Sequence, residues 1–359
     1  MPFYKPIKRI RDNEERVRIA DKLLTLRRQL DAQIPQKTAT ETLLLATWNL
    51  RAFGDNRRTE SLHFIAEIIS RFDLVAVQEI LRQLDGLEKL MTFLGPNWDY
   101  IVTDSTEGTA GHGERMAFLF DKNKVMFKNM ASEIVLADKR DKDNPGPNVL
   151  QFARTPFCVA FQAGWFKFNI TTVHIFYGTA PDTKIEERRL DEIKKAVDFL
   201  SKRSNEEDLS YILLGDFNIP DCKTDYMKAL ESKKFFVPDA IKEHPSNLGK
   251  TKHYDQIAFK IKLEQGMELF DKKNQKAGAF DFTESVYTEE DIDIYRPFFP
   301  PESLITIDKK TNEINPKTEA KILEYYMGTF RTFEMSDHLP LWVELKIDFS
   351  NRYLEKLKV

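Results

Sequence analysis

Five short segments each combine an apolar run with polar residues of the kinds that bind metal ions and phosphates. They are TWNLR (47–51), AVQE (76–79), TVHIFYG (172–178), LLGDFN (213–218) and SDHLP (336–340). Groups at the carboxyl ends of the strands of an α/β sheet meet in one crevice. A single Asp or Asn at a strand end is usually a turn residue, but five such clusters in one chain predict a shared site.

The polar residues of these segments suit the hydrolysis of a phosphodiester. Negative charge spreads over the phosphoryl oxygens as the P–O bond breaks, and a hard cation such as Mg²⁺, with Mn²⁺ as an alternative, offsets that charge. Such a cation binds a few carboxylates together with waters and substrate oxygens. The carboxylates and amides that the segments supply are Glu79, Asp216, Asp337, Asn49 and Asn218.

The same chemistry needs a general base near neutral pH, and two histidines are candidates. They are His338 and His174, and either one requires a carboxylate that fixes the tautomer of its ring. Asp255, in HYDQIAF, and Glu114, in GERMAFLF, are available for that role. Because His174 stands in an apolar run, a buried core ring is the alternative for it. We assign no role to His63, which lies on a predicted helix.

The remaining pattern predicts the elements that position these groups. Apolar runs predict strands at 43–50, 73–80, 99–104, 115–121, 157–164, 168–178 and 211–217. Helices are predicted at 61–71, 86–95 and 186–203. Strands that alternate with helices, followed by paired strands, predict a mixed α/β fold with buried sheets. The polar stretch at 137–148 predicts a loop.

The first 40 residues predict a helical extension before a main domain that spans 41–359. Asp12 and Glu15 have the spacing of a capping box, and a helix is expected over 12–34. The face that we expect to pack on the outside of the domain consists of Val17, Ala20, Leu23, Leu30 and Ile34. A helix that contacts a partner protein or DNA is the alternative.

The region from 263 to 330 lacks the pattern of the main domain, and it predicts an insertion or a lid before the last core strand. It contains an acidic run near 281–293. Such a run is most often a solvated face. If it folded over the crevice instead, it would repel duplex DNA and favour a restricted or small substrate.

Composition limits the classes of protein to which the chain can belong. Its 359 residues are 42% hydrophobic and 12% aromatic, which is enough for a sizeable core and argues against global disorder. The 54 basic and 57 acidic residues give a formal net charge of -3. Proteins that coat nucleic acid are usually strongly basic, so we expect any hold on DNA or RNA to be local.

The sequence also predicts the surroundings in which the protein works. No apolar run reaches the roughly 18 residues of a transmembrane helix, and no signal-peptide core follows the charged start. Cys158 and Cys222 allow at most one disulfide, and no Cys/His cluster has the spacing of a zinc site. We expect a cytoplasmic protein that does not bind membranes.

Taken in order, the motifs resemble those of the endonuclease/exonuclease/phosphatase superfamily, most of all its deoxyribonuclease I branch. TWNLRAFGD, VQE, ERMAFLF, ARTPF, VH, GDFN, YDQI and SDHLPLWVEL follow one another as in that family, from about residue 43 to 347. GDFN or SDH alone would be a weak signal, whereas the ordered set is specific. The resemblance implies a four-layer α/β sandwich, with two packed mixed β-sheets flanked by helices and the site at one edge.

The resemblance implies two catalytic pairs and a metal site. It pairs His338 with Asp255, and His174 with Glu114. Glu79 is implied as the chief metal ligand. The residues implied to lie near the metal are Asn49 and Asp337.

The resemblance also implies how the substrate phosphate is held. Asp216 and Asn218 would position or activate the attacking water and hold the phosphate. Arg51 and Arg154 match arginines that lie close to the phosphodiester backbone in the deoxyribonucleases. The planar fork of arginine can bind two phosphate oxygens. Structural ion pairs are the alternative for these two arginines.

The sequence departs from the deoxyribonuclease pattern at three places. Secreted members of that branch carry a disulfide where this chain has Cys222 and Lys252, so that bridge cannot form, as expected in a reducing compartment. A tyrosine that packs into the DNA minor groove is replaced by His112. The arginine that follows VQE is shifted by one position, to Arg82. These differences bear on the recognition of duplex DNA rather than on the phosphodiester chemistry.

Three classes of function are compatible with these residues. We predict a Mg²⁺- or Mn²⁺-dependent DNA endonuclease of low sequence specificity, which binds DNA through its phosphates and uses in-line attack by water. The alternative is a phosphatase or phosphodiesterase that acts on a small molecule or a lipid headgroup, because the superfamily contains such enzymes. A binding module without catalysis is the third class, and the complete set of bases and carboxylates argues against it.

Overall fold

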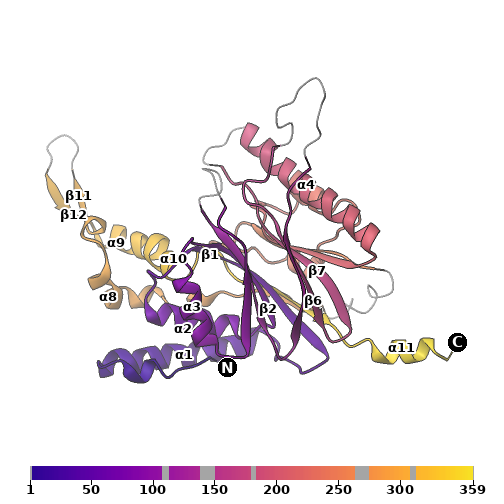
Figure 1. Ribbon diagram of the computed structural model, residues 1–359. Coiled ribbons are helices and arrows are strands. Elements are labelled where there is room, and N and C mark those ends of the chain that lie inside the picture. Colours follow the sequence, from indigo (N-terminus) through magenta and orange to yellow (C-terminus); the bar gives the residue numbers. More distant parts are fainter. Residues whose placement is uncertain are drawn as a thin grey trace.

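The computed structural model describes residues 2–106, 113–137, 150–178, 183–262, 275–307 and 313–358. His112 and most of the predicted loop at 137–148 lie outside the described residues. Within these ranges the chain forms two mixed β-sheets flanked by helices (Figure 1). The predicted four-layer α/β sandwich is confirmed.

Two β-sheets form the centre of the molecule. One has six strands in the order β10-β13-β1-β2-β4-β3, and the other has five strands in the order β5-β6-β7-β8-β9. The strands of the first sheet are β1 (Thr42–Phe53), β2 (Leu74–Ile80), β3 (Trp98–Val102), β4 (Arg115–Asp121), β10 (Ala277–Ala279) and β13 (Leu341–Lys346). Those of the second are β5 (Val125–Glu133), β6 (Phe157–Ala163), β7 (Phe166–His174), β8 (Ser210–Asp216) and β9 (Asp255–Lys260). A separate small hairpin contains β11 (Ile305–Ile307) and β12 (Ile314–Pro316).

The strand β1 is buried on both of its faces. Leu43 and Leu45 belong to the core between the two sheets. Leu44, Ala46 and Trp48 belong to a second core, between the six-stranded sheet and the helices that cover it. Successive side chains of a strand point to opposite faces, so a strand that is buried on both faces has to be an almost unbroken apolar run.

Helices cover the outer face of each sheet. In Figure 1, α1, α2 and α3 lie on the side of the six-stranded sheet, and α4 lies across the five-stranded one. The helices before β9 are α1 (Asn13–Gln33), α2 (Thr59–Ile69), α3 (Asp85–Leu94), α4 (Thr183–Glu207), α5 (Asp225–Leu230) and α6 (Asp239–Lys242). Those after it are α8 (Ile292–Tyr295), α9 (Glu319–Tyr325), α10 (Arg331–Glu334) and α11 (Ser350–Lys356). The predicted helices at 61–71, 86–95 and 186–203 are confirmed.

The predicted strands are confirmed, but one of them ends earlier than predicted, and β9, β10, β11 and β12 were not predicted. The sequence analysis did not predict β5, which is an edge strand whose side chains are mostly exposed or half-buried, so no apolar run marks it. The predicted strand at 168–178 ends at His174, where the main-chain N–H of Ile175 still makes a ladder bond between β7 and β8 by donating to the carbonyl of Asp216 at 2.8 Å. His174 therefore stands at the end of its strand rather than inside it.

The predicted N-terminal helix is present, but its buried face differs from the predicted one. The Asp12 side chain caps α1 by accepting from the N–H groups of Glu14 and Glu15, at 2.8 and 3.0 Å. The residues of α1 that are buried are Ile19, Leu23, Leu26 and Leu30. Val17 and Ala20 are exposed. Val17 lies about 200° around the helix from Ile19, so the two cannot share one buried face.

The described residues of 280–307 and 313–335 contribute side chains to the same helical layer as α1 and α2. Their large side chains in the second core are Phe282, Tyr287, Tyr295, Phe299, Tyr326 and Phe330. Polar contacts join this layer to α1. Arg18 donates to Tyr295 Oη at 3.1 Å, and Lys22 pairs with Asp291 at 2.7 Å. Asp291 lies in the acidic run near 281–293, so part of that run is paired with α1.

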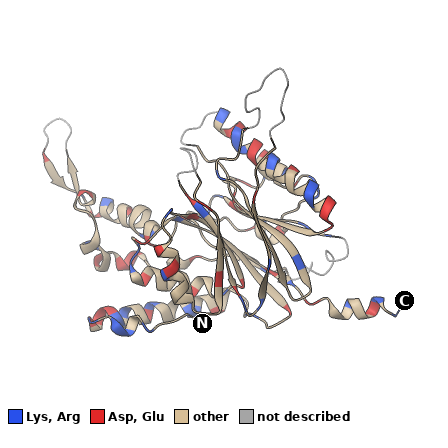
Figure 2. Ribbon diagram, viewed as in Figure 1, with Lys and Arg blue, Asp and Glu red and all other residues tan. Residues whose placement is uncertain are grey.

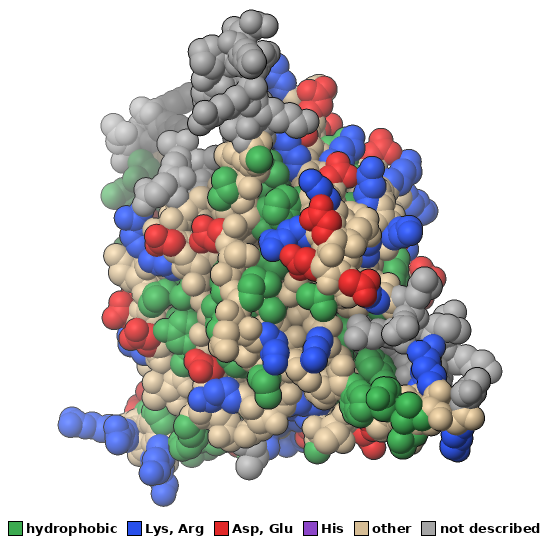
Figure 3. Space-filling view, turned by 45° about the vertical axis from the view of Figure 1, so that its right-hand side comes forward, with side chains coloured by type: hydrophobic (Ala, Val, Ile, Leu, Met, Phe, Trp, Pro, Cys, Tyr) green, Lys and Arg blue, Asp and Glu red, His purple; other side chains and the backbone are tan. Residues whose placement is uncertain are grey.

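Acidic and basic side chains alternate on the outer helices rather than forming separate regions (Figures 2 and 3). On α4, ion pairs four residues apart join Arg188 to Glu192 and Lys195 to Asp191. This mixture agrees with the nearly balanced charge of the whole chain. Among the described residues, no helix has the length and apolar character needed to cross a membrane.

The register of the five-stranded sheet places three candidate residues side by side. His174, at the end of β7, is paired in register with Asp216 at the end of the parallel strand β8. Asp216 is in turn paired with Asp255 at the start of the antiparallel strand β9. In the other sheet β1 and β2 are also parallel, and they carry Asn49 and Glu79 near their carboxyl ends. One edge of the sandwich therefore collects the candidate groups.

Candidate active site

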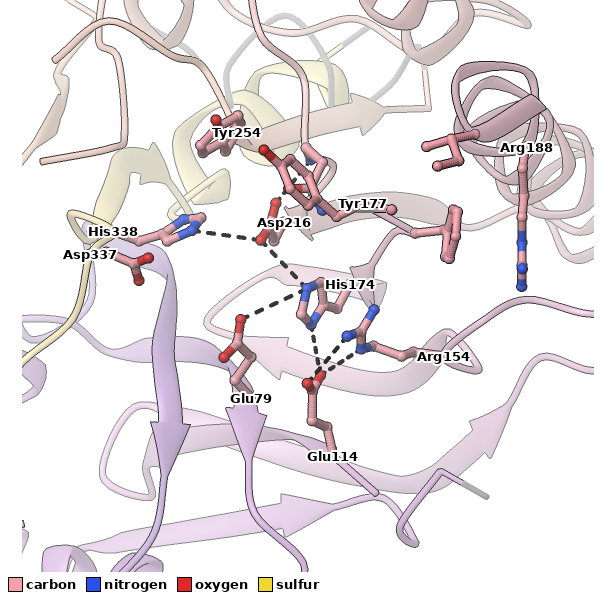
Figure 4. Close-up of a pocket in the computed structure, with 14 residues that line it drawn as sticks. Glu79, Glu114, Arg154, His174, Tyr177, Arg188, Asp216, Tyr254, Asp337 and His338 are labelled. Atoms are coloured by element: carbon pink, nitrogen blue, oxygen red, sulfur yellow. Dashed lines mark hydrogen bonds and ion pairs between the residues drawn. The ribbon is translucent and has the colours of Figure 1, made fainter. Parts of the chain in front are cut away.

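A cavity of about 740 Å³ opens at this edge of the sandwich (Figure 4). The predicted site residues in its wall are Glu79, Glu114, Arg154, His174, Asp216, Asn218, Asp337 and His338. Asn49 and Asp255 are fully buried; Asn49 contacts Glu79 and Asp216, and Asp255 contacts His338. Arg51 reaches Asp337, with 3.9 Å between Nε and Oδ2. The fold thus brings together the candidate catalytic, phosphate-binding and metal-binding residues that the sequence indicated.

His338 and Asp255 form a buried pair. Nδ1 of His338 lies 2.7 Å from Oδ2 of Asp255. The main chain of His338 is also held, because its N–H donates to Ser336 Oγ and its carbonyl accepts from Trp48 Nε1, both at 2.9 Å. Burial alone would lower the pKa of His338, but the negative charges of Asp255 and Asp216 raise that pKa well above its usual range.

His174 and Glu114 form a second pair, which includes Arg154. Nδ1 of His174 lies 3.1 Å from Oε2 of Glu114. Arg154 donates from Nε and Nη2 to the two carboxylate oxygens of Glu114. Burial alone would raise the pKa of Glu114, but His174 and Arg154 lower it to about 2. Arg154 therefore forms the ion pair that was the alternative for it, and it also lines the cavity.

Asp216 lies between the two histidines. Its Oδ2 is 3.7 Å from Nε2 of His174 and 3.8 Å from Nε2 of His338. The same oxygen accepts from Asn49 Nδ2 at 3.0 Å, while Oδ1 accepts from the main-chain N–H of Asn218 at 2.9 Å. Both rings, each backed by a carboxylate at Nδ1, thus direct Nε2 toward one carboxylate oxygen.

An irregular end of β1 positions Glu79. The pairing of β1 with β2 shifts between Asn49 and Phe53, and φ is 41° at Arg51, 50° at Ala52 and 61° at Glu79. This left-handed backbone is costly for residues with a Cβ, by roughly 1–3 kcal/mol each. In return, Glu79 accepts from the N–H of Ala52 at 2.9 Å and from Asn49 Nδ2 at 2.8 Å. Bulges of this kind commonly re-aim side chains at active sites.

Comparison with known proteins now adds to this geometry. A sequence model described as the endonuclease/exonuclease/phosphatase family matches residues 46–263, which is more than half of the chain. The chain belongs to this family. The family likeness expected from the motif order is confirmed.

Curated members of the endonuclease/exonuclease/phosphatase family that resemble this chain include two deoxyribonucleases. A deoxyribonuclease of Thioalkalivibrio sp. (strain K90mix) is 29% identical over 188 residues, which are 51% of this chain and 48% of that protein. Deoxyribonuclease-1 of Canis lupus familiaris is 32% identical over 89 residues, 23% of this chain and 31% of that protein. The chain spans less than half the length of the curated relatives it matches.

Solved structures share the fold at low sequence identity. An endonuclease/exonuclease/phosphatase family protein from Bacteroides thetaiotaomicron matches with a TM-score of 0.52 and 18% identity, covering 86% of this chain and 99% of that one. A mannosyl-6-phosphatase from Bacteroides thetaiotaomicron VPI-5482 matches with a TM-score of 0.50 and 18% identity, covering 84% and 99%. Likeness at this level of identity shows the fold alone.

Enzymes of the endonuclease/exonuclease/phosphatase family generally depend on a divalent metal ion, and the site residues fit such an ion. Glu79, Asp216 and Asp337 present carboxylates to one cavity. Among the ion pairs of the described residues, Glu79 and Asp216 are paired with histidines alone. Oδ1 of Asp255 is buried without a hydrogen-bond partner. A hard cation would balance this excess of negative oxygen.

Two arginines hold the loops that carry the candidate site residues. The sequence analysis did not indicate either of them. The buried Arg57 donates to the carbonyls of Leu50 and Arg51 after Asn49, and to those of Phe333 and Met335 before Asp337. It thereby joins the loops that carry candidate residues from β1 and from the approach to β13. Arg57 lies in a polar segment without a motif, so no sequence signal indicated this role.

Arg189 has a comparable role on the other side of the cavity. It donates to the carbonyls of Phe176, Tyr177 and Asn218. The cavity wall contains further residues that the sequence did not indicate: Phe176, Tyr177, Gly178, Ile185, Arg188 and Tyr254. Among the described residues, none from 275–330 lines the cavity. Asp281 of the acidic run pairs instead with Lys250 at 2.8 Å.

Proposed function

We propose that the protein is a metal-dependent phosphodiesterase, and specifically a DNA endonuclease of low sequence specificity. The observation that carries this proposal is the position of Asp216 Oδ2, within 3.7 Å of Nε2 of His174 and 3.8 Å of Nε2 of His338. In-line displacement at phosphorus needs proton transfer both at the attacking water and at the leaving oxygen. Two carboxylate-backed histidines that face one point can serve these two positions.

In the proposed mechanism, the two pairs divide the proton transfers. His338, oriented by Asp255, prepares the attacking water together with Asp216 and Asn218. His174, held by Glu114, protonates or stabilises the leaving oxygen. Each Nδ1 is occupied by a carboxylate, so each Nε2 is the atom that exchanges a proton with water or substrate.

The metal site in this proposal is centred on Glu79, with Asn49 and Asp337 close by. Mg²⁺ is the expected ion and Mn²⁺ an alternative, because the donors are oxygens. When bound, the ion would offset the charge that develops on the phosphoryl oxygens. Asn49 donates from Nδ2 to both Glu79 and Asp216, which fixes the two carboxylates relative to each other.

Arg51 and Arg154 are the proposed phosphate contacts. Arg154 uses Nε and Nη2 on Glu114, and its place in the cavity wall leaves its guanidinium beside His174. Arg51 lies near Asp337 and against the ring of Phe333, 4.3 Å from the centroid. Binding through phosphates gives little sequence specificity and weakens with salt.

DNA is the proposed substrate because the curated relatives of this chain are named deoxyribonucleases. We also propose that the enzyme works in a reducing compartment such as the cytoplasm. Both of its cysteines, Cys158 and Cys222, are free thiols. We further propose that residues 41–359 act as one catalytic domain, on which α1 packs as an outer helix through the second core.

A second candidate is hydrolysis of a small phosphorylated molecule. The cavity volume of about 740 Å³ favours it, because cavities of this size can enclose a whole small ligand. A lipid headgroup would need a surface that reaches the bilayer as well. Comparing circular DNA with small phosphate esters separates these candidates.

The test is cleavage of circular DNA, which has no ends for an exonuclease. Supercoiled plasmid and circular single-stranded DNA are incubated with Mg²⁺ or Mn²⁺, with and without EDTA. We expect wild-type protein to open the circles, and we expect both EDTA and Glu79→Gln to abolish opening. Glu133→Gln, on the exposed edge strand β5, is the matched control and keeps the activity. If the circles stay intact while small esters release phosphate, the endonuclease proposal is wrong and hydrolysis of a small phosphorylated molecule takes its place.

A further inference from the structure

One part of the cavity wall consists of aromatic side chains that the proposed hydrolysis does not require. Phe176 and Tyr177 follow His174 on the loop after β7, and Tyr254 immediately precedes Asp255; all three aromatic residues line the cavity. Tyr177 is 52% exposed. A large aromatic ring at a cavity mouth, half in water, does not contribute to a hydrophobic core, so its position calls for another explanation.

The aromatic rings form a continuous path to the proposed base. The ring centroids of Tyr177 and Tyr254 are 6.4 Å apart, with the planes at 79°. Tyr254 in turn lies 5.6 Å from the ring of His338. Figure 4 shows Tyr177 and Tyr254 side by side above Asp216. A flat group placed against Tyr177 would therefore lie next to the point at which the phosphate is proposed to react.

The main chain that carries Tyr177 is held in place. Arg189 donates to the carbonyls of Phe176 and Tyr177, and its guanidinium lies 5.2 Å from the centroid of the Tyr177 ring. Gly178 follows with a φ of 78°, and a Cβ at that position would lie 2.2 Å from Cγ2 of Ile185. The chain thus passes close to α4 at a position that strongly favours glycine.

We propose that Tyr177 is a stacking site for an unpaired nucleobase adjacent to the scissile phosphate. This inference rests on the proposed nuclease function and adds to it a preference for unpaired strands over duplex DNA. Aromatic side chains stack on any base, so such a site adds affinity without sequence preference. A base inside a duplex has both faces covered by its neighbours, and it reaches an enzyme side chain only after it is unstacked. Single-stranded DNA should consequently be the better substrate.

The kinetic test compares Tyr177→Ala with Tyr177→Phe on two single-stranded oligonucleotides. One carries normal bases, and in the other a run of tetrahydrofuran abasic units replaces them. We expect Tyr177→Ala to raise KM for the normal oligonucleotide on the order of tenfold, with little change in kcat. Tyr177→Phe keeps the ring and should keep KM within about twofold. KM for the abasic oligonucleotide should be equal in wild-type protein and Tyr177→Ala.

Two kinetic results would overturn the proposal. An unchanged KM for the normal oligonucleotide in Tyr177→Ala would mean that the ring makes no contact with the bases. An equal rise in KM for both oligonucleotides would mean that Tyr177 shapes the cavity or contacts the backbone. Trp165→Ala is the matched control, because Trp165 is 48% exposed and is not among the lining residues.

A binding measurement decides the same question without cleavage. A single-stranded oligonucleotide that contains 2-aminopurine is titrated with His338→Ala protein, and stacking on Tyr177 should quench the fluorescence. The added change Tyr177→Ala should remove the quenching, and Tyr177→Phe should retain it. Quenching that persists in Tyr177→Ala contradicts the proposal. If wild-type protein cleaves no DNA, the proposed function fails, while this titration still decides whether Tyr177 stacks on bases.

Discussion

His338 and His63 are both almost fully buried, but their surroundings change the pKa of the imidazole ring in opposite directions. His338, at the edge of the two sheets, has Asp255 at Nδ1 and Asp216 near Nε2. His63 lies on α2 in the helical layer, stacked on Phe93 with centroids 4.1 Å apart and planes at 6°. Both nitrogens of His63 are buried without a hydrogen-bond partner.

The pKa values of the two rings move in opposite directions for this reason. Acidic neighbours raise the pKa of His338 well above its usual range, in spite of burial. Burial, with no acid to oppose it, lowers the pKa of His63 from 6.5 to about 4. Burial of a histidine therefore does not identify a working base. His338 differs from His63 in the carboxylates around its ring, and in this chain these carboxylates come from other strands.

The largest expected effect follows from removing the ring that has acidic partners. His338→Ala should lower the rate of DNA cleavage by at least ~10²-fold, as for the loss of a general base. His63→Phe keeps an aromatic ring on Phe93 and should retain the wild-type rate. Rates are measured on circular DNA, with the fold of each variant checked by circular dichroism. An equal loss of cleavage rate in the two variants would mean that His338, like His63, contributes only to the stability of the fold.

Removing the second carboxylate should have a smaller effect. Glu114→Gln takes the negative charge from His174 and from Arg154 together, and we expect the rate to fall by roughly 10- to 100-fold, the range seen when a partner of a working side chain is lost. Steady-state kinetics on a single-stranded oligonucleotide measure this effect. The control is Glu207→Gln on α4, whose carboxylate accepts from Asn169 and Arg203, neither of which lines the cavity. A wild-type rate in Glu114→Gln would mean that Glu114 is not needed for cleavage, and it would leave His338 and Asp255 as the pair that acts on the substrate.

The Tm shift on metal binding should depend on the residues at the edge of the two sheets and not on those of the helical layer. Saturating Mg²⁺ is expected to raise the Tm of wild-type protein by roughly 1 to 3 °C, because the ion binds the folded state alone. Glu79→Gln should lose this shift, while His63→Phe should retain it. Differential scanning fluorimetry with Mg²⁺ or EDTA provides the measurement. A shift that survives in Glu79→Gln would place the ion elsewhere.

The smallest expected effect concerns the pH dependence of stability in the helical layer. His63 is neutral in the folded protein until about pH 4, whereas in the unfolded chain it takes up a proton below about pH 6.5. The stability of the wild-type protein is therefore intact above pH 6.5 and falls as the pH drops toward 4, by about 2 kcal/mol at pH 5 from this residue. His63→Phe should lose less stability between pH 7 and pH 5 in urea unfolding. An identical loss would exclude His63 as the source.

The sequence predicted which candidate residues would lie together at one edge of the sheets, but it did not predict the contacts that hold them there. Asn49, Glu79 and Asp216 follow apolar strands, and that local pattern is readable because parallel strand ends converge. Arg57 and Tyr177 have no such pattern, since their contacts involve loops that meet only in three dimensions. The exposure of Val17 shows the same limit on α1, because neighbouring elements choose which face of a weakly amphipathic helix is buried.

A double-mutant cycle on His338 and Asp255 tests the central claim most directly. Cleavage of circular single-stranded DNA is measured for His338→Ala, Asp255→Asn and the double variant, each with verified fold. If the two residues act as one unit, the double variant is about as slow as His338→Ala alone, because Asp255 has no ring left to orient. Losses that multiply, or a wild-type rate in Asp255→Asn, would contradict the proposed role of the pair.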